Sequence, residues 1–344
     1  MNNKKIVFRV DASREIGGGH LSRALTQIKH LSKRKIKCSI ILKGQEVFQC
    51  DQIEVIRIPE EINYGDEVEY LRLKKIQAEL CVFDFVGDHN LHHKEEVKVM
   101  VSDYQRLFQK LAFFDGVGIG AMYDDPEGLD NLDLLVRPYA TAEDLTTARL
   151  LSGFKYYIYS DEYYQLASFK KKQIADLSIV ISFGRSDPNH LTEKILSALE
   201  GLNFFSAIKI SVVIGDMFSK ERIKRIYDQY FKKVSLIIHP NSLKEYFNQC
   251  SIIVCGTGLT KYEACLFEAV VIVCSGSEAD FNLQEQFQQL GLSYHLGPII
   301  NKSYCEVGES LSLFISDPRG IRNKRLSAGN GLALICDRYE KIFT

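Results

Sequence analysis

The sequence has almost no net charge and no long apolar run, and these two absences exclude several classes of protein. Its 344 residues include 43 lysines and arginines and 44 aspartates and glutamates, so the formal net charge is −1. Such a chain has no overall field that attracts nucleic acid or an anionic membrane, so an anion must be bound by a local site. No apolar run approaches the ~20 residues that span a bilayer. We therefore expect neither a nucleic-acid partner nor a membrane span.

Two further signals are missing, at the N-terminus and among the cysteines. The first residues run into a predicted strand at 6–10 without the apolar segment that is typical of a signal peptide. None of the nine cysteines forms a Cys-x-x-Cys pair, and most lie among apolar residues. We predict buried thiols in a reducing cytoplasm, rather than a disulfide framework or a zinc site.

Short apolar segments alternate with amphipathic ones in both halves of the chain. Such alternation predicts an α/β protein with parallel sheets that are covered on both faces. The predicted strands are 6–10, 38–42, 55–58, 80–85, 111–114, 132–136, 177–182, 209–214, 235–238, 252–255 and 270–274. One helix is predicted to follow residue 20. The others are predicted at 67–78, 189–199, 220–231, 243–249, 259–268 and 324–343.

The alternation stops at about residue 138 and resumes near 177, which predicts two doubly wound domains. We assign residues 1–165 to the first domain, 175–323 to the second and 324–344 to a terminal helix. Ligands of doubly wound domains bind beyond the carboxyl ends of the strands. With two domains, the expected site is the cleft between them.

The first loop of interest, 11–23, joins a buried strand to an amphipathic helix. Gly17, Gly18 and Gly19 allow a tight turn and close approach of a ligand. The helix that starts there offers free N–H groups to a phosphate. His20 can act as a general base near neutral pH, and Arg23 follows one turn later. The alternative is a tight turn with a capping histidine. Because the spacing is not G-x-G-x-x-G, we infer no NAD.

Two loops in the second half of the sequence also join a buried strand to a helix and contain glycine, as the loop 11–23 does. In the loop 182–189, Asp187 can cap a helix that has Pro188 at its first position, and Arg185 is either a diphosphate ligand or a surface arginine. In the loop 255–264, Glu263 can accept hydrogen bonds from ribose or simply favour the helix dipole. The candidate nucleotide-binding residues are Gly184, Arg185, Ser186, Asp187, Gly256, Thr257, Gly258, Leu259, Thr260 and Glu263.

These loops resemble those of a known family, the UDP-sugar hydrolases of the pseudaminic acid pathway. Related spore-coat polysaccharide proteins and GT-B glycosyltransferases are also similar. The resemblance covers nearly the whole chain, and Gly-His-x-x-Arg is its most specific element. The motifs that carry it are Arg9-x-Asp11, Ile16-Gly-x-Gly-His20-x-x-Arg23, Gly153-Phe-x-Tyr156, Asp161-Glu-Tyr163, Ser182-Phe-Gly-x-Ser-Asp187 and Gly258-Leu-Thr-x-Tyr-Glu263-Ala.

The resemblance implies a GT-B fold, in which two Rossmann-like domains face a central cleft. It implies hydrolysis of a UDP-linked 2,4-diacetamido-2,4,6-trideoxyhexose to free sugar and UDP, with His20 as the base toward water. It implies no metal or other cofactor. The partners that it implies for the protein are the UDP-sugar and other enzymes of the same pathway. By the same resemblance, Asp11 and Asp84 are catalytic with His20, and the substrate-binding residues are Gly17, Gly18, Gly19, Arg23, Asp115 and Tyr156.

The sequence departs from the family pattern at four points. Phe85 and Val86 follow Asp84 where the family has histidine and tyrosine, Gly116 replaces an aspartate, and Arg185 replaces a glycine. The family's Asn-Gln pair has no clean match near residues 279–284. An inverting glycosyltransferase and a non-catalytic nucleotide-sugar binding protein therefore stay as alternatives. His89, His92 and His93 are close together, but they lack the cysteines or spaced carboxylates of a metal site.

Overall fold

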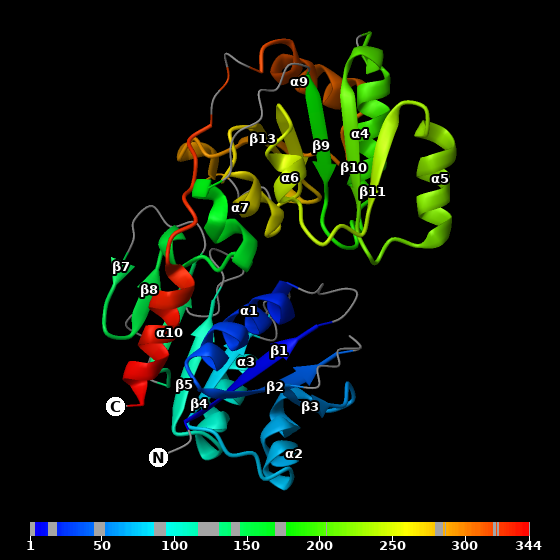
Figure 1. Cartoon of the computed structure of the whole chain (residues 1–344). Helices are drawn as coiled ribbons and strands as arrows, with labels where there is room; N and C mark the ends of the chain where they lie inside the picture. The colour runs from blue at the N-terminus through cyan, green and yellow to red at the C-terminus, as the bar shows by residue number, and fades with distance from the viewer. Residues whose placement is uncertain are drawn as a thin grey trace. The chain divides into compact units, whose positions relative to one another are not determined.

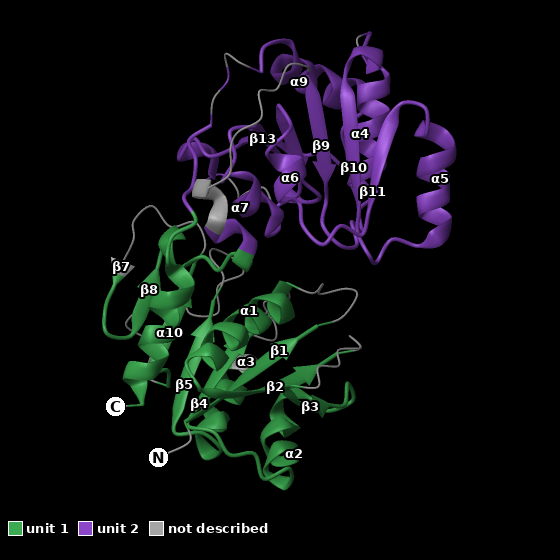
Figure 2. Ribbon diagram, in the orientation of Figure 1, with its two compact units in different colours: residues 1–161, 328–344 green, residues 162–327 purple. Residues whose placement is uncertain are grey.

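The computed structural model describes residues 4–12, 19–44, 52–85, 94–115, 131–138, 145–168, 177–203, 205–278, 285, 287–318, 321 and 323–343. The chain forms two compact α/β units, shown in two colours in Figure 2. The first unit contains residues 1–161 and 328–344, and the second contains residues 162–327. The C-terminal helix therefore groups with the first unit, although the whole second unit separates the two parts in sequence.

The first unit is built on a sheet whose strands are parallel except for one edge strand, β7, which runs antiparallel to β8. The strand order is β3-β2-β1-β4-β5-β6-β8-β7 (Figure 1). The strands are β1 (Lys5–Asp11), β2 (Lys37–Lys43), β3 (Glu54–Ile58), β4 (Leu80–Asp84), β5 (Lys110–Phe114), β6 (Leu134–Arg137), β7 (Leu145–Thr146) and β8 (Leu150–Ser152). The helices are α1 (Gly19–Lys33), α2 (Glu67–Leu73), α3 (Lys94–Asp103) and α10 (Gly331–Ile342), with 3-10 turns η1 (Tyr64–Asp66), η3 (Tyr104–Arg106) and η5 (Phe154–Tyr156).

The two faces of this sheet are covered by different helices. Val7, Phe83 and Phe113 share one face and pack against α2, α3 and η3 in one apolar cluster. The opposite face is covered by α1, which also contacts α10. Side chains that alternate along a strand therefore meet different helices, and this alternation decides which polar residues can meet.

The second unit has a six-stranded, wholly parallel sheet of order β11-β10-β9-β12-β13-β14. Its strands are β9 (Ser178–Ser182), β10 (Lys209–Ile214), β11 (Val234–Ile238), β12 (Ile252–Cys255), β13 (Val270–Ser275) and β14 (Tyr294–Pro298). Its helices are α4 (Leu191–Glu200), α5 (Lys220–Tyr230), α6 (Lys244–Phe247), α7 (Thr260–Ala264) and α9 (Tyr304–Ser316), with 3-10 helices η6 (Asp161–Ser168, beginning at the last residue of the first unit) and η7 (Phe205–Ala207).

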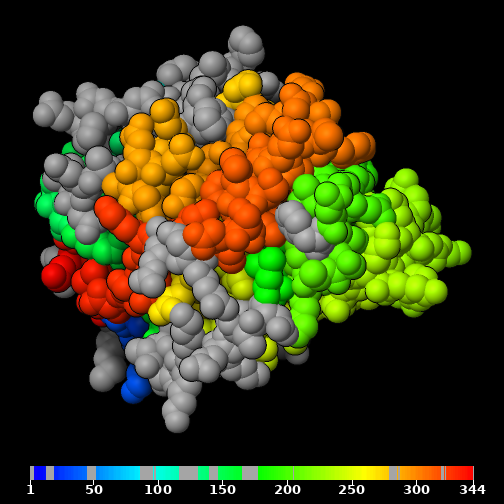
Figure 3. All heavy atoms as spheres, turned by 90° about the horizontal axis from the view of Figure 1, so that it is seen from above, coloured from blue at the N-terminus to red at the C-terminus, as the bar shows by residue number. Residues whose placement is uncertain are grey.

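One large apolar cluster joins this sheet to α4, α5 and α9. The two helices α4 and α9 lie side by side although about a hundred residues separate them, and Figure 3 shows their green and orange segments in contact. Gly308 makes this close packing possible, because a Cβ there would lie 2.9 Å from the carbonyl oxygen of Ala198.

The predicted fold class is confirmed: two Rossmann-like units, each built on a parallel sheet. Among the described helices and strands, five were not predicted, namely α3, β7, β8, β14 and α9. Several predicted helices are shorter in the structure: α2 ends at Leu73, α7 ends at Ala264 and α10 begins at Gly331. The prediction for Pro188 was wrong, because α4 begins at Leu191 and Pro188 lies in the turn before it. None of the described helices is long and apolar enough to cross a membrane.

The predicted burial of the cysteine side chains is confirmed for most of those that the structure describes. Cys81, Cys250, Cys255, Cys265, Cys274 and Cys336 are buried and unpaired with one another, whereas Cys38 is half-buried and Cys305 is exposed. Burial raises the pKa of the Cys250 thiol to about 12, so this thiol stays protonated near neutral pH.

Candidate active site

His20, Arg23 and Asp84 form a polar cluster at the carboxyl end of the first sheet. His20 lies in the first turn of α1, and Asp84 is the last residue of β4. His20 Nδ1 lies 2.7 Å from Asp84 Oδ1. Arg23 Nε donates to Asp84 Oδ2 over 2.6 Å, and its Nη2 also contacts Oδ1. The structure therefore brings together three of the residues that the sequence predicted.

The state of Asp84 determines the tautomer of His20. The Asp84 side chain is fully buried, and burial alone would raise its pKa, but the Arg23 guanidinium and the hydrogen bonds from His20 and Arg23 lower the pKa below its ordinary value. An ionised carboxylate can only accept hydrogen bonds, so the 2.7 Å contact requires a proton on Nδ1 of His20. Neutral His20 then carries its lone pair on Nε2, and 18% of its side chain is exposed.

Asp11 belongs to a different cluster, on the opposite face of the sheet. Val10 and Asp84 are register partners in β1 and β4, so Asp11 points away from Asp84. Arg9 Nη1 bonds Asp11 Oδ1, and the Tyr64 hydroxyl lies 3.5 Å from Asp11 Oδ2. The structure therefore does not bring the Asp11 carboxylate to His20.

Glu67 is the centre of this second cluster, and the sequence did not reveal it. Arg9 Nη2 donates to Glu67 Oε1 over 2.8 Å, and Lys43 Nζ donates to the same oxygen over 3.1 Å. The Tyr104 hydroxyl donates to Oε2 over 2.9 Å. Burial alone would raise the pKa of Glu67, but Arg9 and Lys43 lower it. The available signal was Arg9 itself, since a cation inside an apolar strand requires a buried partner.

Two aromatic residues border the Arg9 cluster. The Phe85 ring lies 5.1 Å from the Arg9 guanidinium carbon and stacks on Tyr64, with ring centroids 6.2 Å apart. Lys43 Nζ lies 4.4 Å from the Tyr64 ring centroid. The departure at Phe85 therefore places an apolar ring over a buried guanidinium, where it makes a cation–π contact.

The other predicted substrate residues of the first unit have partners within that unit. Asp115 is buried and accepts from Arg137 Nη2 over 3.3 Å. The Tyr156 hydroxyl bonds the Thr146 hydroxyl, and the Tyr156 ring is buried. Gly19 is the first residue of α1. Predictions that lie outside the described residues include those at Gly17, Gly18, Val86, His89, His92, His93, Gly116 and 279–284.

In the second unit, Asp187 is tied into the fold. Its two carboxylate oxygens accept from the backbone N–H groups of Leu191 and Thr192, each over 2.9 Å. Arg222 Nη2 bonds Asp187 Oδ2 over 2.6 Å and Glu193 Oε2 over 2.6 Å. The residue at the N-cap position of α4 is His190, but Asp187 accepts from two N–H groups of the first turn as a cap does, and these contacts use both of its oxygens.

Arg185 is more accessible than Asp187. It forms a two-point ion pair with Asp216, with Nε–Oδ1 of 2.8 Å and Nη2–Oδ2 of 2.6 Å. Both side chains are partly exposed. Gly184 has a φ of +81°, and Gly215 approaches the Arg185 backbone so closely that a Cβ would lie 2.1 Å from its carbonyl oxygen. The two glycines therefore hold the loop in a conformation that presents the Arg185 fork.

The loop after β12 is open, and it leads to an unusual carboxyl group. A Cβ at Gly258 would meet nothing within 4 Å. Lys261 Nζ donates to the Thr257 carbonyl oxygen over 2.9 Å, which fixes the turn into α7. Burial raises the pKa of Glu263 to about 7, although the Tyr163 hydroxyl donates to Oε2 over 3.2 Å. Leu259 and Thr260 lie at the start of α7.

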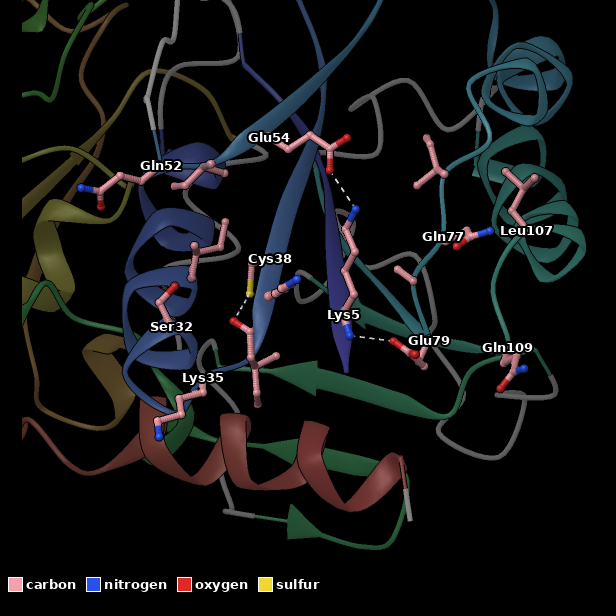
Figure 4. Close-up of a pocket in the computed structure, with 16 residues that line it drawn as sticks. Lys5, Ser32, Lys35, Cys38, Gln52, Glu54, Gln77, Glu79, Leu107 and Gln109 are labelled. Atoms are coloured by element: carbon pink, nitrogen blue, oxygen red, sulfur yellow. Dashed lines mark hydrogen bonds and ion pairs between the residues drawn. The ribbon is translucent and has the colours of Figure 1, made fainter. Parts of the chain in front are cut away.

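A cavity of about 940 Å³ lies at the other end of the first sheet, where the strands begin. Lys5 crosses it, with Nζ 2.8 Å from Glu54 and its backbone N–H 2.6 Å from Glu79 (Figure 4). The cavity therefore lies away from His20 and Asp84, which are at the carboxyl end of the sheet. Within the described ranges, no group of three or more His, Cys, Asp or Glu side chains is placed to hold a metal ion.

Comparison with solved structures identifies the fold as GT-B. The MurG structure from Acinetobacter baumannii has a TM-score of 0.61 at 11% identity, covering 98% of this chain and 99% of that one. A glycosyltransferase from Rickettsia africae has a TM-score of 0.59 at 11% identity and covers both chains completely. The UDP-GlcNAc 2-epimerase from Neisseria meningitidis, bound to UDP-GlcNAc, has a TM-score of 0.57 at 15% identity over 98% of this chain and all of that one.

Comparison with curated sequences gives two distant relatives. An uncharacterized protein of Methanocaldococcus jannaschii, MJ1062, is 26% identical over 310 residues, which are 86% of this chain and 60% of that protein. The UDP-2,4-diacetamido-2,4,6-trideoxy-beta-L-altropyranose hydrolase of Campylobacter jejuni is 23% identical over 278 residues, which are 77% of this chain and 89% of the hydrolase. No protein-family model matches the sequence.

Proposed function

We propose that this protein hydrolyses a UDP-linked 2,4-diacetamido-2,4,6-trideoxyhexose, or a similar nucleotide-activated amino sugar, to the free sugar and UDP. The observation that carries the proposal is the 2.7 Å bond between His20 Nδ1 and Asp84, which leaves the Nε2 lone pair as a base. The distant similarity to the Campylobacter jejuni hydrolase supports the same chemistry. The reaction would serve nonulosonic acid or surface polysaccharide synthesis in the cytoplasm, beside other enzymes of that pathway.

In the proposed step, His20 Nε2 takes a proton from water while the water oxygen attacks the anomeric carbon. The bond from that carbon to the diphosphate oxygen breaks, and its electron pair leaves with UDP. Asp84 stabilises the imidazolium that forms, because a buried carboxylate lies against its Nδ1–H. Displacement by one water molecule inverts the anomeric configuration.

The second unit would bind the nucleotide in this proposal. Glu263 and Tyr163, 3.2 Å apart, are suited to the ribose hydroxyls. Arg185 is suited to the diphosphate, because a guanidinium fork binds phosphate oxygens as it now binds Asp216. The 256–260 loop would add backbone N–H groups to the departing diphosphate. As part of this proposal, residues 1–165 form the domain that carries the catalytic histidine, residues 175–323 form the nucleotide-binding domain, and residues 324–344 form a terminal helix.

An inverting glycosyltransferase is the second candidate, supported by the likeness of the fold to the Rickettsia africae glycosyltransferase. The same His20 base would then activate an acceptor hydroxyl instead of water. An epimerase is the third, supported by the Neisseria meningitidis structure. A protein that binds a nucleotide sugar without turnover is the remaining alternative.

The test is to incubate the purified protein with UDP-linked diacetamido-trideoxyhexoses in H₂¹⁸O, without an acceptor, and to follow UDP by chromatography and mass spectrometry. We expect UDP without ¹⁸O, because water attacks carbon and not phosphorus. UDP release that requires an added sugar, lipid or peptide would select the glycosyltransferase. An isomerised UDP-sugar would select the epimerase, and tight binding without any product would select the binding protein.

The variant His20→Gln tests the assigned base, and His30→Gln is its matched control on the same helix. His30 lies near the end of α1 with Nε2 2.8 Å from Arg34, away from Asp84. Loss of general-base catalysis lowers kcat by about 100-fold or more. Equal rates for wild type and His20→Gln would overturn the mechanism.

A further inference from the structure

The C-terminal helix is linked to the candidate active site by a buried chain of hydrogen bonds. The Tyr339 hydroxyl on α10 donates to Gln27 Oε1 on α1 over 2.8 Å. Gln27 Nε2 donates to the carbonyl oxygen of Arg23 over 3.4 Å. Arg23 in turn holds Asp84 through Nε and Nη2, and Asp84 holds His20. All five residues belong to the first unit.

Because its members at Tyr339 and Gln27 are buried, this chain of hydrogen bonds has a fixed geometry. Tyr339 and Gln27 are both 0% exposed, so neither can replace its partner with bulk water. A buried polar group without a partner costs free energy, and the amide of Gln27 can satisfy both ends only in this orientation. The pKa of the Tyr339 phenol is well above its ordinary value, chiefly because of burial and also because of Cys336 and Asp84. The hydroxyl therefore stays a donor at all pH values of interest.

Ion pairs at the surface support the same contact between α10 and α1. Arg34 pairs with Asp337 and, over 2.7 Å, with Glu340. Their side chains are partly exposed, so these pairs add little stability and do not fix an orientation inside the unit. The buried Tyr339–Gln27 bond is the contact that reaches the turn of α1 bearing Arg23.

We propose that Tyr339 and Gln27 are positioning residues for His20, Arg23 and Asp84, so that the C-terminal helix is part of the catalytic apparatus of the first unit. This proposal rests on the proposed function, because it assumes that His20 is the base. Neither residue touches substrate. They act by holding the Arg23 turn, and hence the orientation of Asp84 against His20 Nδ1.

The first test is Tyr339→Phe, which removes one oxygen atom and keeps the ring. We expect kcat to fall by about 3- to 10-fold, the range of one buried hydrogen bond, with KM within about 2-fold of wild type. Tyr230→Phe is the matched control, since Tyr230 is a buried tyrosine of the second unit that is hydrogen-bonded to Ser197 and Gln229. For Tyr230→Phe we expect a drop in melting temperature similar to that of Tyr339→Phe, but an unchanged kcat. Equal kcat in wild type and Tyr339→Phe, or equal losses in the two variants, would overturn the proposal.

The second test is a double-mutant cycle with Gln27→Met. If both residues act through one chain of hydrogen bonds, the double variant has nearly the kcat of the Gln27→Met single variant. Multiplicative losses would mean that Tyr339 and Gln27 act separately, which contradicts the proposal.

A spectroscopic measurement separates this proposal from the proposed function. In ¹⁵N-labelled protein, assigned with His20→Gln, we expect the His20 Nδ1 proton to exchange with water about 3- to 10-fold faster in Tyr339→Phe than in wild type, because opening of the His20–Asp84 bond becomes easier. This signal needs no substrate. An inactive wild type with the expected exchange would reject only the hydrolase; unchanged exchange would reject the positioning role.

Discussion

Asp11 and Asp84 end adjacent strands of one sheet, yet their side chains lie on opposite faces. Val10 is the register partner of Asp84, and Lys43 is the register partner of Asp11, so the two carboxylates follow opposite phases of the alternation. Asp84 meets His20 and Arg23 from α1, whereas Asp11 meets Arg9. The two carboxylates are therefore held by separate networks, and only Asp84 is in contact with the proposed base.

Replacing Asp84 with asparagine is expected to lower kcat by about 100-fold or more. An amide can donate to Nδ1 of His20 and thereby stabilise the tautomer that has its proton on Nε2, which removes the base. Steady-state UDP release measures the effect. Asp133→Asn is the control, because Asp133 accepts from Lys110 Nζ and the Leu111 N–H and does not contact His20. A rate in Asp84→Asn like that of the control would contradict the assigned tautomer.

Glu263 is expected to make the second unit less stable as the pH rises toward neutrality. Its folded-state pKa is about 7, above the ordinary value of 4.5, so the folded state holds the proton more tightly than the unfolded state. Its stabilising effect is complete below about pH 4.5 and is lost as the pH rises through about 7. Urea unfolding at pH 5 and pH 8 should show a loss on the order of 2 kcal/mol in wild type that is absent in Glu263→Gln. The same loss in both proteins would refute the assignment to Glu263.

Arg185→Ala is expected to weaken UDP binding while leaving the fold intact. The exposed pair with Asp216 contributes less than about 1 kcal/mol to stability. A two-point bond to the diphosphate is worth more, so we expect the Kd for UDP to rise about 10-fold in calorimetry. Arg185→Lys keeps the charge and loses the fork, and should show an intermediate Kd. Unchanged affinity in Arg185→Ala would mean that Arg185 serves only Asp216.

Arg222→Met is expected to destabilise the second unit by about 3 kcal/mol or more. The change leaves Asp187 buried without its cationic partner, and breaking a buried ion pair from one side is costly. Chemical unfolding measures the loss. Arg72→Met is the control, because Arg72 forms an exposed pair with Glu69 and should change stability by less than about 1 kcal/mol. Similar losses in the two variants would contradict this account.

Much of the fold was predictable because buried parallel strands are short, apolar and separated by amphipathic helices. The second sheet illustrates this: the strands predicted at 209–214 and 252–255 are those observed as β10 and β12. The elements that were missed have weaker signals. Strand β14 contains His295, Gly297 and Pro298, and α9 contains Gly308, whose role depends on its close contact with Ala198.

The site was predictable only where its residues lie near one another in sequence or in a recognisable motif. His20 and Arg23 share one turn of α1, and Asp84 ends a strand beside them. Glu67 and Tyr339 could not be found in this way. They reach the same unit from helices that lie 58 residues from Arg9 and 312 residues from Gln27, respectively. Sequence periodicity gives no register between such distant segments.

The return of α10 to the first unit has a consequence for biosynthesis. Helix α1 begins at residue 19, but the helix that packs on it begins at residue 331, after the whole second unit. Chains fold from the N-terminus as they leave the ribosome. The second unit can therefore finish folding before α10 leaves the ribosome. Until then, α10 cannot cover the face of α1 that bears Gln27.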